Sequence, residues 1–299
     1  IADTHHVGAG ITDPDAVRAL VQEGAARVQE LIEMGVPFDL DEQGKPELAR
    51  EGGHSRARVL RAGGDATGRE IERVLAEQVA KHPNIEIFEN VFVTEILTKD
   101  GAAYGVKAVL PETGKEIDFL APATLLATGG YAQVYATSSN PASAIGDLIA
   151  VAYRAGAQVS NMEMMQFHPT TLVVPAEREI KDPLIPFLPV NFLVSEAVRG
   201  AGAKLVNVKG EYFMKQYDPR GELASRDIVA RAIFDQMQKT GAGHVFLDVS
   251  DLKEHGQKIT FKERFPTIYA RCVEMGLDPD TDPRIPVAPA AHYSMGGIK

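Results

Sequence analysis

Apolar residues recur at helical spacing near the start of the chain. They follow Asp13-Pro14, where Asp can cap free backbone N–H groups and proline suits the first helical position, and the run stops at Gly35. This pattern predicts a helix between these two points. Thr67-Gly68-Arg69-Glu70 matches a capping box and predicts a second helix that extends to about Val79.

The pattern changes from helical spacing to alternation after this helix. β-branched and aromatic residues alternate with polar ones over residues 85–98, and Pro111-Glu112-Thr113-Gly114 has the composition of a turn between two further alternating runs. A short apolar run then ends in Thr128-Gly129-Gly130. The sequence therefore predicts strands over residues 85–98, 104–110, 116–120 and 123–127.

The second half of the chain mixes helical and strand patterns around a proline-rich segment. Prolines crowd residues 175–189, which predicts a long loop or an insertion. We predict helices over residues 144–155, 190–200, 226–239 and 261–275, and strands over residues 204–208 and 245–249. This mixture, with a change of character after Asn161, predicts an α/β domain combined with an α+β domain.

Charge and composition exclude several classes of protein. The 299 residues carry a net charge of −10 without a Lys/Arg-rich run, which argues against nucleic-acid binding and gives no attraction to an anionic membrane. An anionic substrate would therefore need a local cationic pocket. Residues 119–146 are uncharged but interrupted by glycine, serine, asparagine and proline, which predicts a buried strand and a polar loop with no membrane span. Cys272 is the only cysteine, which excludes an internal disulfide and fits a reducing cytoplasm.

Thr128-Gly129-Gly130 is a candidate ligand-binding turn. Glycine lets the backbone approach a ligand because no Cβ intervenes, although a tight turn alone also explains the pair. Asp147, near a helix start, could cap backbone N–H groups or accept from a cofactor hydroxyl, and both alternatives stay open. The Gly-x-Gly-x-x-Gly turn of dinucleotide-binding folds does not occur in the chain.

His168, His292 and Arg226 are the candidate groups for binding a carboxylate. Either imidazole could be a structural residue or could donate a hydrogen bond to a carboxylate oxygen, and no metal-ligand spacing surrounds them. Arg226 stands at a helix start, where it could be solvated or could act as a carboxylate clamp and proton donor. Glu196 and Arg199 have i, i+3 spacing, for which a surface ion pair is the default interpretation.

The order of five local motifs resembles one flavoprotein family, that of L-aspartate oxidase and the flavoprotein subunits of succinate dehydrogenase and fumarate reductase. The motifs are Glu51-Gly52-Gly53-His54-Ser55, Gln166-Phe167-His168-Pro169-Thr170, Ser195-Glu196-Ala197-Val198-Arg199-Gly200, Ser225-Arg226-Asp227 and Ala291-His292-Tyr293-Ser294-Met295-Gly296-Gly297. The resemblance covers nearly the whole chain. Glu51 makes it most similar to the aspartate oxidases, in which a carboxylate at this position is thought to face the substrate's ammonium group. The segment Ala176–Phe187 looks like an insertion relative to the family.

The resemblance implies a fold, a cofactor and roles for individual residues. The fold is a partial FAD-binding Rossmann-like domain of the α/β class over residues 1–161, an inserted α+β substrate-capping domain over 162–292, and a return toward the first domain over 293–299. FAD is expected to lie against Phe92, Val93, Thr128, Gly129, Gly130 and Asp147. Substrate carboxylates are expected to be held by His168 and His292, helped by Ser195 or Thr170. Arg226 would be the acid/base residue, with Glu196 and Arg199 as its proton relay.

The reaction that the resemblance implies is oxidation of L-aspartate to iminoaspartate by hydride transfer to FAD, with oxygen or fumarate as electron acceptor. It would serve NAD biosynthesis in the cytoplasm, beside quinolinate synthase. The family's glycine-rich ADP-binding turn and its C-terminal region are missing, so the chain resembles a central fragment. Two alternatives stay open: a fumarate reductase or succinate dehydrogenase flavoprotein subunit, which has no use for an acid at Glu51, and a catalytically silent fragment that binds a C4 dicarboxylate without flavin.

Overall fold

The computed structural model describes residues 1–50, 53–64, 66–174, 191–254 and 257–299. They form two compact units. The first unit comprises Ile1–Ile85, Pro169–Arg178 and Leu193–Ala288, and the second comprises Glu86–His168, Glu179–Phe192 and Pro289–Lys299. These units are defined by compactness alone, so the predicted domain boundaries stay a prediction. The proline-rich segment at residues 175–189, predicted to be a long loop or an insertion, lies outside the described residues. Glu51 also lies outside them.

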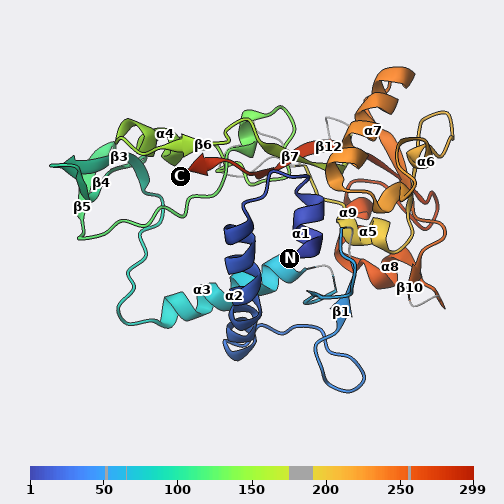
Figure 1. The fold of residues 1–299 in the computed structure, drawn as a ribbon, viewed down its shortest axis with the longest axis horizontal. Coiled ribbons are helices and arrows are strands. Elements are labelled where there is room, and N and C mark those ends of the chain that lie inside the picture. The colour runs from blue at the N-terminus through green and yellow to red at the C-terminus, as the bar shows by residue number, and fades with distance from the viewer. Residues whose placement is uncertain (51–52, 65, 175–190, 255–256) are drawn as a thin grey trace. The chain divides into compact units, whose positions relative to one another are not determined.

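Two long helices, α2 (Pro14–Glu33) and α3 (Thr67–Lys81), dominate the N-terminal part of the first unit (Figure 1). Asp13 caps α2 as predicted, since its Oδ1 accepts from the N–H of Asp15 at 2.8 Å and of Ala16 at 3.0 Å. The capping box predicted for α3 does not form, because the Thr67 hydroxyl lies inside the first turn and accepts from the Ala62 N–H at 3.1 Å. This part also contains α1 (Ala2–Val7), β1 (Leu48–Ala49) and β2 (Val59–Leu60).

The rest of the first unit contains most of a four-stranded sheet with the strand order β7-β12-β9-β8; β7 up to His168 and β12 from Pro289 onward belong to the second unit. Antiparallel pairing places Leu247 opposite both Leu205 and Ile285, and all three side chains are buried. α7 (Arg226–Thr240) packs against β9 and buries Val229 and Ile233. The strands are β7 (Met165–Leu172), β8 (Lys204–Val206), β9 (Val245–Asp248) and β12 (Arg284–Ser294).

Short elements complete the first unit. The helix predicted over residues 261–275 is in fact two helices, because Pro266 lacks the N–H needed to continue the first and instead occupies the first position of the second. Cys272 is fully buried, and burial raises the pKa of its thiol to about 12. The elements are α5 (Glu196–Gly200), α6 (Met214–Tyr217), η3 (Gly221–Leu223), β10 (Lys253–Glu254), β11 (Gln257–Lys258), α8 (Phe261–Arg264) and α9 (Pro266–Glu274).

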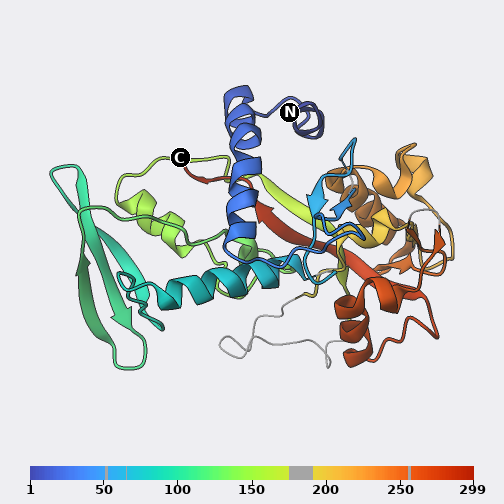
Figure 2. The ribbon, with the colours of Figure 1, turned by 90° about the horizontal axis from the view of Figure 1, so that it is seen from below.

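An antiparallel three-stranded sheet and one helix form most of the second unit (Figures 1 and 2). Gly105 allows the close approach of two of the strands, since a Cβ there would overlap the carbonyl oxygen of Phe119. The sheet contains β3 (Phe92–Lys99), β4 (Ala102–Leu110) and β5 (Lys115–Leu120) in that order, and α4 (Asp147–Arg154) packs against β3. The 3₁₀ turn η1 (Ala132–Val134) precedes α4, and β6 (Val159–Ser160) pairs with β13 (Gly297–Ile298).

Strand positions are the main departure from the sequence prediction. The predicted strand over residues 123–127 is wrong, because this apolar segment pairs with no strand among the described residues. β3 begins at Phe92 rather than at residue 85, and α5 begins at Glu196 rather than near residue 190. The sequence did not predict β7 or β12, whose patterns Pro169, Pro286 and Pro289 interrupt.

Helices and sheets are mixed in both units, in agreement with the predicted combination of α/β and α+β structure. Among the described residues, no helix combines the length and the apolar character that crossing a membrane requires.

Candidate functional site

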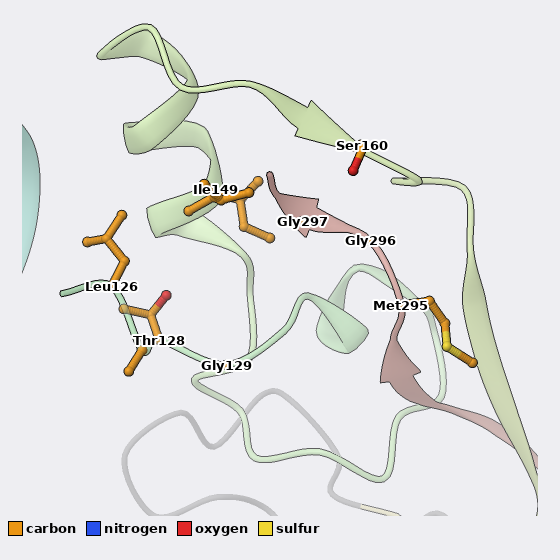
Figure 3. A pocket seen from close by; sticks show the side chains of 10 residues that line it. Leu126, Thr128, Gly129, Ile149, Ser160, Met295, Gly296 and Gly297 are labelled. Atoms are coloured by element: carbon orange, nitrogen blue, oxygen red, sulfur yellow. The ribbon is translucent and has the colours of Figure 1, made fainter. Parts of the chain in front are cut away.

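A cleft of about 330 Å³ opens in the second unit (Figure 3). Its volume lies at the lower end of the range for ligand pockets, which is roughly 300–1,000 Å³. The wall contains Thr128 and Gly129, two of the candidate cofactor-binding residues, together with residues of α4, β6, β13 and the β12–β13 connection. The lining residues are Leu126, Ala127, Thr128, Gly129, Ile149, Ser160, Met295, Gly296, Gly297 and Ile298.

Two glycine pairs expose backbone at or beside this cleft. Gly129 has a φ of +72°, a conformation that favours glycine. A Cβ on Gly130 would overlap the Ser294 side chain, and a Cβ on Gly296 would overlap the Asn161 carbonyl oxygen. Glycine therefore allows the segments around the cleft to approach closely. The pair Gly296-Gly297 ends the motif that begins at Ala291, but only the fold shows that it lines the same cleft as Thr128.

Asp147 is the first residue of α4, and Gly146 is the N-cap of this helix. The Asp147 carboxylate accepts no hydrogen bond from the described residues, so the helix-capping alternative is not supported. A carboxylate that the helix leaves uncommitted suits a cofactor hydroxyl. Phe92 and Val93 pair with Val109 and Ala108 in the β3–β4 ladder. They are not among the cleft-lining residues, and their contact with a cofactor stays a prediction.

The two predicted imidazoles meet in the second unit. His168 at the middle of β7 is fully buried, and its ring centroid lies 5.1 Å from that of His292 on β12. His292 Nδ1 lies 2.6 Å from Ser139 Oγ, and the Tyr293 ring centroid lies 4.0 Å from the His292 ring. Within the described ranges, no cluster of His, Cys, Asp and Glu has the arrangement of a metal site.

Glu196, Arg199 and Arg226 form a buried charged group in the first unit. Arg226 Nε donates to Glu196 Oε2 at 2.6 Å, and Arg199 Nη2 lies 3.6 Å from Glu196 Oε1. Arg199 Nη1 also donates to the Glu222 carbonyl oxygen at 2.6 Å. Glu196 is 8% exposed and Arg199 only 1%, so the default interpretation as a surface ion pair is wrong. The Glu196 carboxylate therefore connects the buried guanidinium of Arg199 with that of Arg226, whose side chain is 22% exposed.

The Ser195 hydroxyl stands directly before this group in the chain. Its oxygen is buried and has no hydrogen-bond partner among the described residues. Such atoms are uncommon in folded proteins, because an unmade hydrogen bond is costly. Thr170 differs, since its hydroxyl donates to the Val194 carbonyl oxygen at 2.8 Å and so fixes the residue that precedes Ser195. Of these two predicted substrate donors, Ser195 is the one whose hydroxyl is uncommitted.

The Asp3 carboxylate forms hydrogen bonds with Ser55 and Arg58, in the segment that follows Glu51. Its Oδ2 accepts three hydrogen bonds, from the Ser55 N–H at 2.8 Å, the Ser55 hydroxyl at 2.9 Å and Arg58 Nη1 at 2.8 Å. The hydrogen bonds from Ser55, with the help of Arg58, lower the pKa of Asp3 to about 2. The sequence analysis missed this residue, because the partners are 52 and 55 positions apart.

Comparison with known proteins identifies the family. A family model described as an FAD binding domain matches residues 1–299. The chain belongs to the family of FAD-binding domains. Family membership indicates FAD as the cofactor, as the sequence predicted. The glycine-lined cleft and the uncommitted Asp147 carboxylate fit this cofactor.

Several relatives resemble this FAD-binding chain over nearly all of its length. The L-aspartate oxidase 2-b, chloroplastic, of Nicotiana tabacum is 47% identical over 302 residues, which cover 99% of this chain and 45% of the relative. The L-aspartate oxidase of Streptomyces coelicolor is 46% identical over 301 residues, which cover 99% and 49%. A solved structure of E. coli quinol fumarate reductase matches with a TM-score of 0.85 and 29% identity, covering 99% of this chain and 50% of that one. The chain thus spans about half the length of these relatives.

Proposed function

We propose that this chain forms part of a flavin-dependent oxidase that converts L-aspartate to iminoaspartate. The observation that carries the proposal is the group of buried Glu196, buried Arg199 and half-buried Arg226, which supplies fixed guanidinium charge in a chain whose net charge is −10. A small dicarboxylate needs such local positive charge. The relatives at 46% and 47% identity are L-aspartate oxidases, which favours an amino dicarboxylate over a plain one.

The side chains offer a donor for each anionic part of this substrate. Arg226 Nε donates to Glu196, and a guanidinium group has the fork geometry that clamps a carboxylate. His168, His292 and the Ser195 hydroxyl are the further carboxylate donors in the proposal. Thr170 acts by holding the backbone before Ser195. Glu51 is proposed to face the substrate's ammonium group.

Oxidation of an amine requires an acceptor for a hydride and a route for a proton. FAD, when bound, supplies the hydride acceptor, and Thr128, Gly129, Gly130 and Asp147 are the residues proposed to hold it. The chain itself orients the substrate's Cα–H and neutralises its carboxylates, which reduces the entropic cost of the reaction. Oxygen or fumarate as final electron acceptor, and quinolinate synthase as the enzyme that uses the product for NAD biosynthesis, belong to the proposal.

Proton transfer is assigned to the buried charged group. A guanidinium stays protonated under ordinary conditions, whereas a carboxylate gains and loses protons readily. Glu196 contacts both Arg226 and Arg199, at 2.6 and 3.6 Å. We therefore propose that Arg226 is the acid/base group at the substrate, and that Glu196 and Arg199 restore its proton.

A fumarate reductase or succinate dehydrogenase flavoprotein is the second candidate, because E. coli quinol fumarate reductase shares the fold with a TM-score of 0.85. The variant Glu51→Gln separates the two. We expect it to abolish oxidation of aspartate while sparing reduction of fumarate. Equal loss of both activities would remove the argument for aspartate.

The direct test is an anaerobic titration of the full-length flavoprotein that contains this chain. L-Aspartate should bleach the visible flavin absorption, whereas succinate at the same concentration should only perturb it. In Glu196→Gln, the rate of bleaching should fall by about a hundredfold, the usual size of a lost general acid/base contribution. Asp227→Asn is the matched control, because Asp227 pairs with Arg231 on the exposed surface of α7. Flavin that aspartate leaves unbleached would overturn the proposal.

A further inference from the structure

The ring of His292 is held on several sides within the second unit. Ser139 Oγ lies 2.6 Å from Nδ1, and the Asn140 side-chain amide donates to the His292 carbonyl oxygen at 2.6 Å. The rings of His168 and Tyr293 lie 5.1 and 4.0 Å from the His292 ring. The Ser139 contact differs from the others, because it is a hydrogen bond to one particular ring nitrogen.

Ser139 is itself fixed by the backbone. Ser138 forms a parallel bridge with Ala291, and the Ser139 N–H donates to the Ala291 carbonyl oxygen at 3.0 Å. In return, the Ala291 N–H donates to the Thr137 carbonyl oxygen at 3.0 Å. The segment that carries Ser139 therefore runs alongside β12 at the residue before His292, and the hydroxyl has a defined position.

The hydroxyl has two hydrogen-bonding arrangements. It can donate to His292 Nδ1, the 2.6 Å contact, while Asn140 Nδ2 approaches the same oxygen at 3.5 Å. It can instead donate to the Ala291 carbonyl oxygen at 3.3 Å and accept from a protonated Nδ1. A serine hydroxyl carries one proton and two lone pairs, so a simple rotation exchanges these arrangements.

We propose that Ser139 is a positioning residue for His292, whose hydroxyl faces Nδ1 and keeps Nε2 as the nitrogen that donates to a substrate carboxylate. When the ring is neutral, the hydroxyl donates to Nδ1, and the ring proton resides on Nε2. When the ring is an imidazolium, Nδ1 donates to the hydroxyl, and Nε2 again carries a proton. Nε2 is thus a donor in both protonation states.

This inference rests on the proposed function, in which His292 binds a carboxylate. It adds that His292 offers an N–H donor to a carboxylate in both charge states of the ring. Without the hydroxyl, the neutral ring can place its proton on either nitrogen, and only the imidazolium presents a donor at Nε2 reliably. Among the described residues, the titratable rings of His168 on β7 and Tyr293 on β12 lie beside His292. Segment 137–140 contributes only hydroxyl and amide side chains.

The test is the affinity of the full-length FAD-loaded protein for succinate, a dicarboxylate without the amine, measured by perturbation of the flavin spectrum from pH 6 to pH 8.5. Ser139→Ala should weaken binding by about five- to tenfold at the alkaline end, the size of one lost hydrogen bond, and by less at the acidic end. Ser139→Thr keeps the hydroxyl and should restore both the affinity and the wild-type pH profile.

Ser138→Ala is the matched control. Its hydroxyl accepts from the Asn140 N–H at 3.1 Å and forms no hydrogen bond with His292 among the described residues. Equal loss of affinity in Ser138→Ala and Ser139→Ala, or wild-type affinity and pH profile in Ser139→Ala, would overturn the inference. If Ser139→Ala does not retain flavin, Ser139→Cys provides a weaker donor of similar volume. This variant should bind succinate with an intermediate affinity. Wild-type affinity in Ser139→Cys would equally overturn the inference.

Failure of the proposed function has a different signature. It appears as wild-type flavin that L-aspartate does not bleach, whatever the effect of Ser139 on succinate binding. The Ser139 variants report on the His292 ring even when aspartate is not the substrate, because the readout is binding and requires no turnover.

Discussion

The two units differ in the polar groups that they hold inside the fold. The first unit uses permanent charge, in the form of Arg226 and Arg199 on either side of the buried Glu196 carboxylate. The second unit uses neutral donors and bare backbone: an imidazole fixed by a serine hydroxyl, and glycines around a cleft. A buried charge is stable only when it is paired with an opposite charge. The stability of neutral donors and closely packed backbone depends instead on how well the packed segments fit each other. The two units should therefore respond to different kinds of substitution.

Removing the shared carboxylate of the first unit should have the largest effect on stability. Glu196→Ala removes the carboxylate that lies 3.6 Å from the guanidinium of Arg199, a residue that is only 1% exposed. Breaking a buried ion pair in this way costs about 3–5 kcal/mol. We expect the free energy of unfolding to fall by this amount in urea or guanidinium titrations of the full-length protein.

The matched control for Glu196→Ala is Asp227→Ala, which removes an exposed partner of Arg231 on α7, with side chains 60% and 75% exposed. Exposed pairs at this spacing contribute less than about 0.5 kcal/mol. Comparable losses in the two variants would mean that burial does not distinguish the Glu196 group.

Crowding the backbone of the second unit should have an intermediate effect. In Gly296→Ala, the new Cβ would overlap the Asn161 carbonyl oxygen, and overpacking of this kind costs about 1–3 kcal/mol. We expect weaker retention of flavin during gel filtration, since Gly296 lines the cleft. Gly243→Ala places its Cβ in open space and should behave as wild type. A Gly296→Ala protein that keeps its flavin would show that backbone approach at this glycine is not required.

The exposed carboxylate of Asp3 should give the smallest effect and a characteristic pH dependence. Its pKa is lowered to about 2 in the folded protein, from 3.8 as an ordinary carboxyl group. A lowered folded-state pKa stabilises the protein above the unfolded value, and this contribution is lost as the pH falls from about 4 to about 2. Asp3→Asn should therefore be slightly less stable than wild type at pH 6, with a difference that shrinks toward pH 2. A constant difference in the midpoint of urea unfolding across this range would contradict the assignment.

Local signals predicted the helices well. Asp13 and Pro14 define the start of α2 through contacts with the next few residues, so the sequence contains all the necessary information. The segment 123–127 shows the opposite case, because a strand requires a partner from elsewhere in the chain. The position of β12 was likewise hidden, since its two prolines argue against a strand when neighbours are unknown.

The candidate site follows the same division between local and distant information. The motifs identified His168, His292, Glu196 and Arg226, and the fold brings each pair together. Burial could not be predicted from i, i+3 spacing, so Glu196 and Arg199 were first interpreted as a surface pair. Ser139 was missed, because 153 positions separate it from His292 and a serine in a polar loop carries no signal of its own.

The single buried thiol, that of Cys272, allows local opening of the first unit to be measured separately. Cys272 on α9 is the only cysteine in the chain, and its pKa of about 12 keeps it in the unreactive thiol form at neutral pH. A thiol-specific dye can modify it only when the surrounding structure opens. The labelling rate would therefore report transient opening around α9 in the first unit.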